Sequence, residues 1–185
     1  DTACLATLPP RQFSSGMAEV IKTGCVADSA LLDAAECGLS PEDTEALTVM
    51  IAGCCRAKLR LVGGDVEDRG ARRLLNFGHT FGHGYEAAGG FSTYTHGEAV
   101  AAGMCRTLRW QAAHGCDGSL LPRLEKILTK YRLPTALDCD DAVLRRYVQR
   151  DKKTAGGRVT LAIVQRAGQG ELLSLPLDAL WEDET

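Results

Sequence analysis

Apolar residues recur at steps of three or four over most of the chain, which is the spacing of an amphipathic α-helix. The clearest such run follows Ser40-Pro41-Glu42-Asp43, where Ser40 can cap a helix and Pro41 fits its first turn. Gly63 and Gly64 permit the left-handed turn that would end this helix. Further helices are expected over 16–27, 79–88, 97–114, 119–131, 140–150 and 178–184.

Two stretches near the C-terminal end have a different pattern. Val159–Val164 and Glu171–Leu175 predict short strands, joined by a turn around Gly168-Gln169-Gly170. Residues 69–76 are expected to form an irregular basic connection. Because two strands are too few for a βαβ sheet, the predicted fold class is mainly α, multi-helical, with a short β-hairpin near the C-terminus.

The overall composition limits the possible functions. The 185 residues suffice for one domain, 1–185, and contain no apolar run long enough to cross a membrane. The net charge of −3 argues against a nucleic-acid partner. No secretory leader is visible, and the eight cysteines include no CxxC pair, so reduced thiols in the cytoplasm are expected. The absence of a starting Met suggests a fragment, a processed chain or the second half of a longer protein.

Three of the four histidines, His79, His83 and His96, lie within 18 residues. His79 and His83 are one helical turn apart and can bind zinc from one face, although the sequence is not HExxH. An isolated pair of this kind more often consists of surface histidines or of histidines whose hydrogen bonds are satisfied within the fold. However, His96 could add a third imidazole, and a carboxylate such as Glu19 or Glu98 could complete a zinc site with an open position.

Glycines and cations strengthen the hypothesis of a site. A glycine stands beside each of these histidines, although a glycine costs a helix about 1 kcal/mol relative to Ala, so a close approach of backbone or ligand is expected. In an acidic chain, a local group of cations indicates an anionic ligand, and the alternative is a solvated basic face. The glycines are Gly78, Gly82 and Gly97, and the cations are Lys22, Lys58, Arg72, Arg73, Lys152 and Lys153, with Asn76 close to the arginines.

Three ordered motifs resemble one enzyme family. SGMAEVIKTG (Ser15–Gly24), LLNFGHTFGH (Leu74–His83) and HGEAVAAGM (His96–Met104) closely resemble 3-dehydroquinate synthase, and RDKK (Arg150–Lys153) resembles a late lysine motif of that family. Members have an N-terminal α/β domain that binds NAD and a C-terminal helical domain that holds the metal. This chain resembles only the helical domain and has no strand–GxGxxG–helix unit of its own.

The resemblance implies roles for the residues of the histidine-rich region. Glu19, His79 and His96 match the family's ligands for Zn²⁺, a site that Co²⁺ could also occupy. His83 then becomes a catalytic residue that contacts substrate or handles a proton. Glu98 is expected to support a ligand rather than bind the metal itself.

The resemblance also assigns the cations. Lys22 and Lys58 match catalytic lysines that hold the substrate's carboxylate and hydroxyls, and Arg72 and Asn76 match contacts on the phosphate side. Lys152 is favoured over the lysine that follows it for a further anion contact.

The implied reaction converts 3-deoxy-D-arabino-heptulosonate 7-phosphate to 3-dehydroquinate and phosphate. It proceeds by transient oxidation by NAD⁺, phosphate elimination, reduction and an intramolecular aldol step. The implied partners are the N-terminal NAD-binding domain and, in the full-length protein, a second copy in a homodimer. Because the chain has no NAD-binding unit of its own, no turnover is expected from it alone.

Two other classes of function compete with this interpretation. The chain could belong to a related sugar-phosphate cyclase or a metal-dependent polyol dehydrogenase with a similar helical domain. It could also be a non-catalytic helical domain that binds a metal or an anion. The intact NFGHTFGH segment favours the dehydroquinate reaction.

Overall fold

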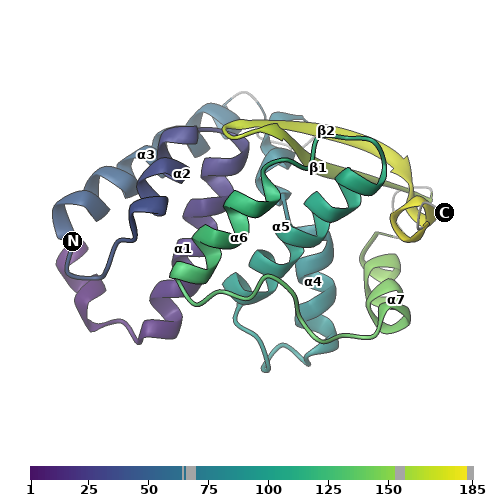
Figure 1. The fold of residues 1–185 in the computed structure, drawn as a ribbon, viewed down its shortest axis with the longest axis horizontal. Coiled ribbons are helices and arrows are strands. Elements are labelled where there is room, and N and C mark those ends of the chain that lie inside the picture. The colour runs from purple at the N-terminus through teal and green to yellow at the C-terminus, as the bar shows by residue number, and fades with distance from the viewer. Residues whose placement is uncertain (64, 66–69, 153–156, 183–185) are drawn as a thin grey trace.

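The computed structural model describes the chain except for residues 64, 66–69, 153–156 and 183–185 (Figure 1). It consists mainly of helices with one C-terminal β-hairpin, so the predicted fold class is confirmed. The α-helices are α1 (Pro10–Val26), α2 (Ser29–Cys37), α3 (Thr44–Gly63), α4 (His79–Ala88), α5 (His96–Ala113), α6 (Leu121–Lys130) and α7 (Asp141–Lys152); the 3₁₀ helices are η1 (Thr2–Thr7), η2 (Ala71–Asn76) and η4 (Leu177–Trp181); the strands are β1 (Arg158–Arg166) and β2 (Gln169–Pro176).

The first two α-helices differ from the prediction. α1 begins at Pro10 rather than Gly16, because a proline in the first turn gives up an N–H that would have no helical partner. α2 was not predicted, although its boundaries have ordinary signals. The Asp28 side chain accepts a hydrogen bond from Ala30 N, and Gly38 ends the helix with a φ of 83°.

Two further boundaries are corrected near the middle of the chain. α3 begins at Thr44, because the Asp43 carboxylate accepts hydrogen bonds from both the backbone and the hydroxyl of Ser40 and so closes a turn before the helix. Its predicted end at Gly63 is confirmed. Part of the expected irregular connection forms η2, which leads directly into the start of α4.

The predicted hairpin is antiparallel and is tied to α5 by one buried side chain. Val159 pairs with Leu175 and Ile163 with Glu171, with a bulge near the turn. The Gln111 amide donates to Val164 O at 3.0 Å, and its carbonyl accepts from Val164 N at 3.1 Å. Both polar ends of Gln111 are therefore satisfied within the core.

The core consists of two hydrophobic clusters that meet along α5. The first joins residues of α1, α2, α3 and α6 with Ala162 and Val164 of β1, and the second joins α4, α7, η4 and the other buried residues of the hairpin. α5 contributes Met104 and Leu108 to the first cluster, and Ala99 and Ala102 to the second. Helices from both clusters can therefore present side chains at the N-terminal end of α5.

Within the part of the chain that the structure describes, we find no helix with the length and apolar character needed to cross a membrane.

Candidate metal centre

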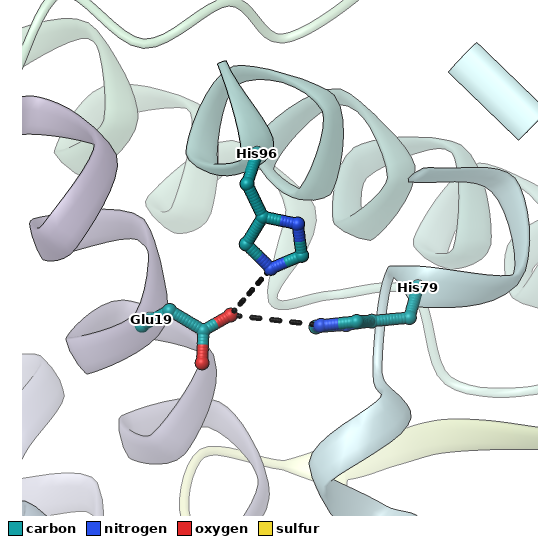
Figure 2. A group of neighbouring side chains, drawn as sticks. All are labelled: Glu19, His79 and His96. Atoms are coloured by element: carbon teal, nitrogen blue, oxygen red, sulfur yellow. Dashed lines mark ion pairs between the residues drawn. The ribbon is translucent and has the colours of Figure 1, made fainter. Parts of the chain in front are cut away.

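Three residues with metal-binding side chains converge from three different helices (Figure 2). Glu19 lies in α1, His79 is the first residue of α4, and His96 is the first residue of α5. Glu19 Oε1 lies 3.6 Å from His79 Nε2 and 3.5 Å from His96 Nε2. One ligand atom from each residue lies within 4.8 Å of the other two. The structure thus brings together the three residues that the sequence predicted as ligands.

The chemistry of this cluster fits a divalent cation. Glu19 Oε1 is buried and has no hydrogen-bond partner in the described part of the chain. A buried carboxylate oxygen without a hydrogen-bond partner lowers the free energy of unfolding. A cation bound between this oxygen and the two imidazole nitrogens would offset that cost. Two nitrogens and one oxygen are the donor set of a zinc site that keeps a position open.

Both imidazoles have a partner on the nitrogen that faces away from Glu19. His79 Nδ1 lies 3.2 Å from Phe77 O, and His96 Nδ1 lies 3.1 Å from Glu86 Oε1. An Nδ1–H that donates to such an acceptor leaves the Nε2 lone pair for a metal. Sequence reasoning missed Glu86. The available signal was its spacing, about two turns after His79 on the same face of α4.

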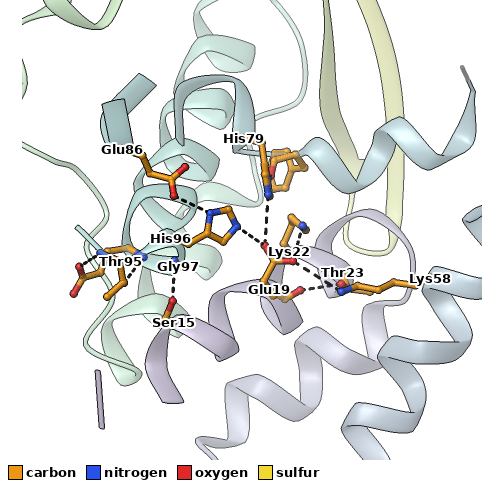
Figure 3. A network of polar contacts seen from close by, with 12 residues as sticks. Ser15, Glu19, Lys22, Thr23, Lys58, His79, Glu86, Thr95, His96 and Gly97 are labelled. Carbon is orange, nitrogen blue, oxygen red and sulfur yellow. Dashed lines mark hydrogen bonds and ion pairs between the residues drawn. The ribbon is translucent and has the colours of Figure 1, made fainter. Parts of the chain in front are cut away.

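A close contact between α1 and α5 places Glu19 opposite His96. Gly97 N donates to Ser15 Oγ at 2.9 Å, and a Cβ on Gly97 would lie only 2.3 Å from Ser15 O (Figure 3). Glu19 follows Ser15 by about one helical turn, and His96 immediately precedes Gly97. The expected close approach at this glycine is therefore confirmed.

A second close contact places His79. Gly78 has a φ of 78°, and a Cβ on it would lie 2.6 Å from Met104 Cγ and 2.8 Å from Val100 O. A Cβ on Gly82 would lie 3.3 Å from Ala99 O. The start of α4 therefore rests directly on α5, which accounts for the glycines beside His79 and His83.

Lys22 and Lys58 place positive charge beside the cluster. Lys22 Nζ lies 2.8 Å from Glu19 Oε2, and its side chain is only 4% exposed. Lys58 Nζ lies 4.0 Å from the same oxygen and is 46% exposed (Figure 3). Burial alone would raise the pKa of Glu19, but the approach of His96 and the ammonium of Lys22 outweigh it and hold the pKa well below its usual range. Glu19 is therefore ionised.

Burial acts on the two neighbouring basic groups in the same direction. It lowers the pKa of His79 to about 4, and the positive charge of Lys22 contributes to this shift. Burial also lowers the pKa of Lys22, against the attraction of Glu19. His79 is therefore neutral near pH 7, which is the form of imidazole that binds a metal.

Glu98 does not support a ligand as expected. Its carboxylate accepts from Thr95 N at 2.8 Å and so completes a capping box at the start of α5. Arg11 donates to both oxygens of Glu98, at 2.7 and 2.6 Å, and these bonds lower the pKa of Glu98. Besides the proposed ligand Glu19, the carboxylate of Glu86 contacts a histidine of the site.

The remaining predicted residues lie at different distances from the cluster. The exposed ring of His83 has its centroid 5.3 Å from that of His79 and 6.5 Å from that of His96. Arg72 is half-buried and Asn76 exposed on η2, just before α4. Lys152 ends α7, and its side chain lies outside the described residues, as does all of Lys153.

Sequence comparisons agree on one family. The family model described as 3-dehydroquinate synthase C-terminal matches residues 16–154. A 3-dehydroquinate synthase of Shewanella loihica is 39% identical over 191 residues, which cover 99% of this chain and 53% of that protein. One from Shewanella sp. (strain MR-4) is 38% identical over 182 residues, covering 94% of this chain and 50% of that protein. The chain thus spans about half the length of these curated relatives.

Solved structures share the fold. A 2-epi-5-epi-valiolone synthase from Streptomyces hygroscopicus subsp. jinggangensis 5008, with NAD⁺ and Zn²⁺ bound, superposes with a TM-score of 0.85 at 23% identity, over 97% of this chain and 52% of that one. A 2-deoxy-scyllo-inosose synthase complexed with carbaglucose-6-phosphate, NAD⁺ and Co²⁺ gives 0.81 at 22% identity, with the same coverage. From the match over residues 16–154, this chain belongs to the 3-dehydroquinate synthase family and corresponds to its C-terminal part.

Proposed function

We propose that this chain forms the metal- and substrate-binding half of a 3-dehydroquinate synthase. The whole enzyme would convert 3-deoxy-D-arabino-heptulosonate 7-phosphate to 3-dehydroquinate and phosphate, a step of aromatic amino acid biosynthesis. NAD⁺ would be bound mainly by the N-terminal half that the relatives possess. The observation that carries the proposal is the buried Glu19 Oε1, which has no hydrogen-bond partner in the described part of the chain and faces the Nε2 atoms of His79 and His96.

Glu19 and His79 are ready to bind a cation without first losing a proton, whereas a cation would compete with a proton at His96, whose pKa is raised by Glu19 and Glu86. Glu19 is ionised and His79 is neutral near pH 7, for the reasons given above. These two residues and His96 would hold Zn²⁺ or Co²⁺. A divalent ion bound there supplies a Lewis acid that lowers the pKa of a substrate hydroxyl.

Lys22 and Lys58 would bind the carboxylate and hydroxyls of the substrate. An ammonium has three donors, and Lys22 directs one of them to Glu19; the others have no acceptor among the described residues and would bind a ligand at the centre. Lys58 approaches the same carboxylate from α3 with its end nearly half exposed. Two cations beside one ionised carboxylate favour a ligand that brings further negative charge.

Arg72, Asn76, Lys152 and His83 would complete the substrate site. Arg72 and Asn76 come from η2, directly before the ligand His79, and are suited to contacts with an anionic group. Lys152 would contact a further anionic group from the end of α7. His83 lies one turn after His79 on α4 and could transfer a proton to or from a substrate oxygen.

The proposal makes the chain dependent on a second unit. We expect no turnover from this chain alone, because NAD⁺, the hydride acceptor, would be bound mainly by the N-terminal half that the relatives possess. We also expect the full-length protein to be a cytoplasmic homodimer. Light scattering of the full-length protein would measure its mass in solution and test the dimer.

The decisive experiment is a product assay on the chain joined to its N-terminal half. With Zn²⁺, NAD⁺ and the heptulosonate phosphate, we expect 3-dehydroquinate and phosphate in equal amounts. A different carbocycle, formed from a different sugar phosphate, would identify a related cyclase instead. Failure to bind Zn²⁺ and a phosphonate analogue of the substrate, together with no effect of His79→Ala, would show that the proposed site is wrong.

A further inference from the structure

Glu86 lies on the face of α4 that contains His79 and His83, and it points toward His96 rather than toward solvent (Figure 3). Its side chain is 17% exposed, and Oε1 lies 3.1 Å from His96 Nδ1. α4 therefore contributes one imidazole to the candidate metal centre directly. Through Glu86, α4 also contacts a second imidazole, which comes from α5.

The two imidazoles are held by different kinds of partner. The His79 ring is 12% exposed, and its Nδ1 faces the backbone oxygen of Phe77, which no side-chain substitution removes. The His96 ring is 44% exposed and stands at the first position of α5, so surrounding atoms restrain it less. The orientation of His96 therefore depends on the Glu86 carboxylate far more than that of His79 depends on any one side chain.

A carboxylate at this place can act in two ways. As an acceptor it keeps the proton on His96 Nδ1, so that Nε2 presents its lone pair toward Glu19, and it makes the imidazole a stronger ligand. As a charge it adds to that of Glu19 and offsets the ammonium groups of Lys22 and Lys58. Both effects favour a bound cation. Substitution by glutamine removes the charge and keeps an acceptor oxygen, whereas substitution by alanine removes both.

We propose that Glu86 is a positioning residue of the metal centre: by accepting the Nδ1–H of His96, it fixes the tautomer and ring orientation with which His96 binds a divalent cation opposite Glu19. The inference rests on the proposed metal-binding function and deepens it. Glu86 acts through His96 and is not one of the three residues whose ligand atoms form the cluster.

The experiment measures Zn²⁺ affinity by competition with a chelator in the purified protein and in three variants. Glu86→Ala removes both the acceptor and the charge, so we expect about 10- to 100-fold weaker Zn²⁺ binding. Glu86→Gln keeps an acceptor oxygen, so its loss should be smaller, on the order of 3- to 10-fold. Glu125→Ala is the matched control, because it removes a carboxylate that pairs with Arg109 at 2.5 Å in an exposed ion pair outside the cluster. It should stay within about twofold of the parent.

A second measurement distinguishes positioning from general support of the fold. In the Zn²⁺-loaded protein, ¹⁵N-edited spectra should show a slowly exchanging His96 Nδ1 proton, retained in Glu86→Gln and lost in Glu86→Ala. Thermal unfolding of the metal-free variants reports the fold independently of the metal.

The outcomes separate the inference from the function on which it rests. If the parent protein binds neither Zn²⁺ nor Co²⁺, the metal-binding function fails and the role of Glu86 fails with it. If the parent binds and folded Glu86 variants bind within twofold of it, the function stands and the role of Glu86 is wrong. Should Glu86→Ala not fold, the spectra decide, since a Zn²⁺-loaded parent protein without the slowly exchanging His96 Nδ1 proton overturns the inference.

Discussion

The residues proposed to bind the metal and those proposed to bind the substrate's anionic groups come from regions of different construction. Glu19, His79 and His96 arise from α-helices that meet through glycines, with a backbone contact at Gly97. By contrast, Arg72 and Asn76 lie on a short 3₁₀ helix, and Lys58 is nearly half exposed on α3. The proposed metal ligands thus depend on helix packing, as does the buried Lys22, whereas Arg72, Asn76 and Lys58 lie where packing constrains them less.

This difference has a functional consequence. A metal site needs its ligands held within a fraction of an ångström, which rigid helices provide. A substrate that changes shape during several steps benefits from side chains that can follow its charges. We therefore predict that substitutions of the proposed metal ligands alter both metal binding and stability, whereas substitutions of Arg72, Asn76 or Lys58 alter the binding of the anionic ligand alone.

The largest effect should come from Glu19→Gln. The change removes the charge of a proposed ligand and leaves the buried Lys22 ammonium without its counter-charge. We expect the affinity for Zn²⁺ to fall by at least about 100-fold, beyond the usual effect of losing a supporting group. The free energy of unfolding of the metal-free protein should fall by about 1–3 kcal/mol. Elemental analysis after dialysis measures the bound zinc, and urea denaturation measures the stability. A variant that retains a full equivalent of zinc would contradict the assignment of Glu19 as a ligand.

The next effect tests the helix contact itself. In Gly97→Ala, the new Cβ would meet Ser15 O at 2.3 Å, so α1 and α5 must separate. We expect a loss of about 1–3 kcal/mol in the free energy of unfolding, with weaker zinc binding because Glu19 and His96 move apart.

Gly16→Ala is the matched control for the Gly97 variant. Gly16 lies next to Ser15 in the same helix, and a Cβ there would have nothing within 4 Å. This change should stabilise the protein by about 0.5–1 kcal/mol through helix propensity and leave zinc binding unchanged. Equal behaviour of the two alanine variants would mean that the close helix contact does not set the site.

The candidate site could be predicted from the sequence only in part. Helical spacing places His79 and His83 on one face, so the residues alone left open which of them is the ligand and whether Glu19 or Glu98 is the acid. The family motifs decided these questions, and the geometry agrees for the metal trio. What spacing could not reveal is the approach of α1 to the start of α5, since it depends on a tertiary contact.

Errors in predicting the fold came from competing local interactions. The sequence predicts that the first helix begins at Gly16, but α1 already contains Ser14, whose hydroxyl donates to Pro10 O one turn earlier in the helix. Glu98 was expected to support a ligand because it stands beside His96, but the helix start and Arg11 engage its carboxylate. In both cases, a polar side chain had a nearer partner than the one inferred for it.

A smaller effect should follow from Arg72→Ala. If the Arg72 guanidinium binds an anionic group as proposed, its loss should weaken the binding of a phosphonate substrate analogue by about 10-fold, in line with a hydrogen bond to a charged group. Zinc content should stay at the parent level. Isothermal titration of the zinc-loaded protein measures the first quantity and elemental analysis the second.

Arg73→Ala serves as the neighbouring control for Arg72. Arg73 Nη1 donates to Thr160 Oγ1 at 3.2 Å and so connects η2 to the hairpin. Its loss should lower stability and leave analogue binding close to that of the parent. If analogue binding falls more in Arg73→Ala than in Arg72→Ala, the substrate contact belongs to Arg73.

The smallest effect should come from Lys58→Ala, and it tests the contrast most closely. Lys58 and Lys22 both approach Glu19 Oε2, but at 4.0 and 2.8 Å, with side chains 46% and 4% exposed. Water and salt screen the charge of the exposed lysine, so its loss should weaken analogue binding only about two- to five-fold, and less at high ionic strength. Lys22→Ala should have the larger effect, with little dependence on salt. Titrations at two salt concentrations would measure both, and equal salt dependence would show that the two lysines do not differ in the way their burial predicts.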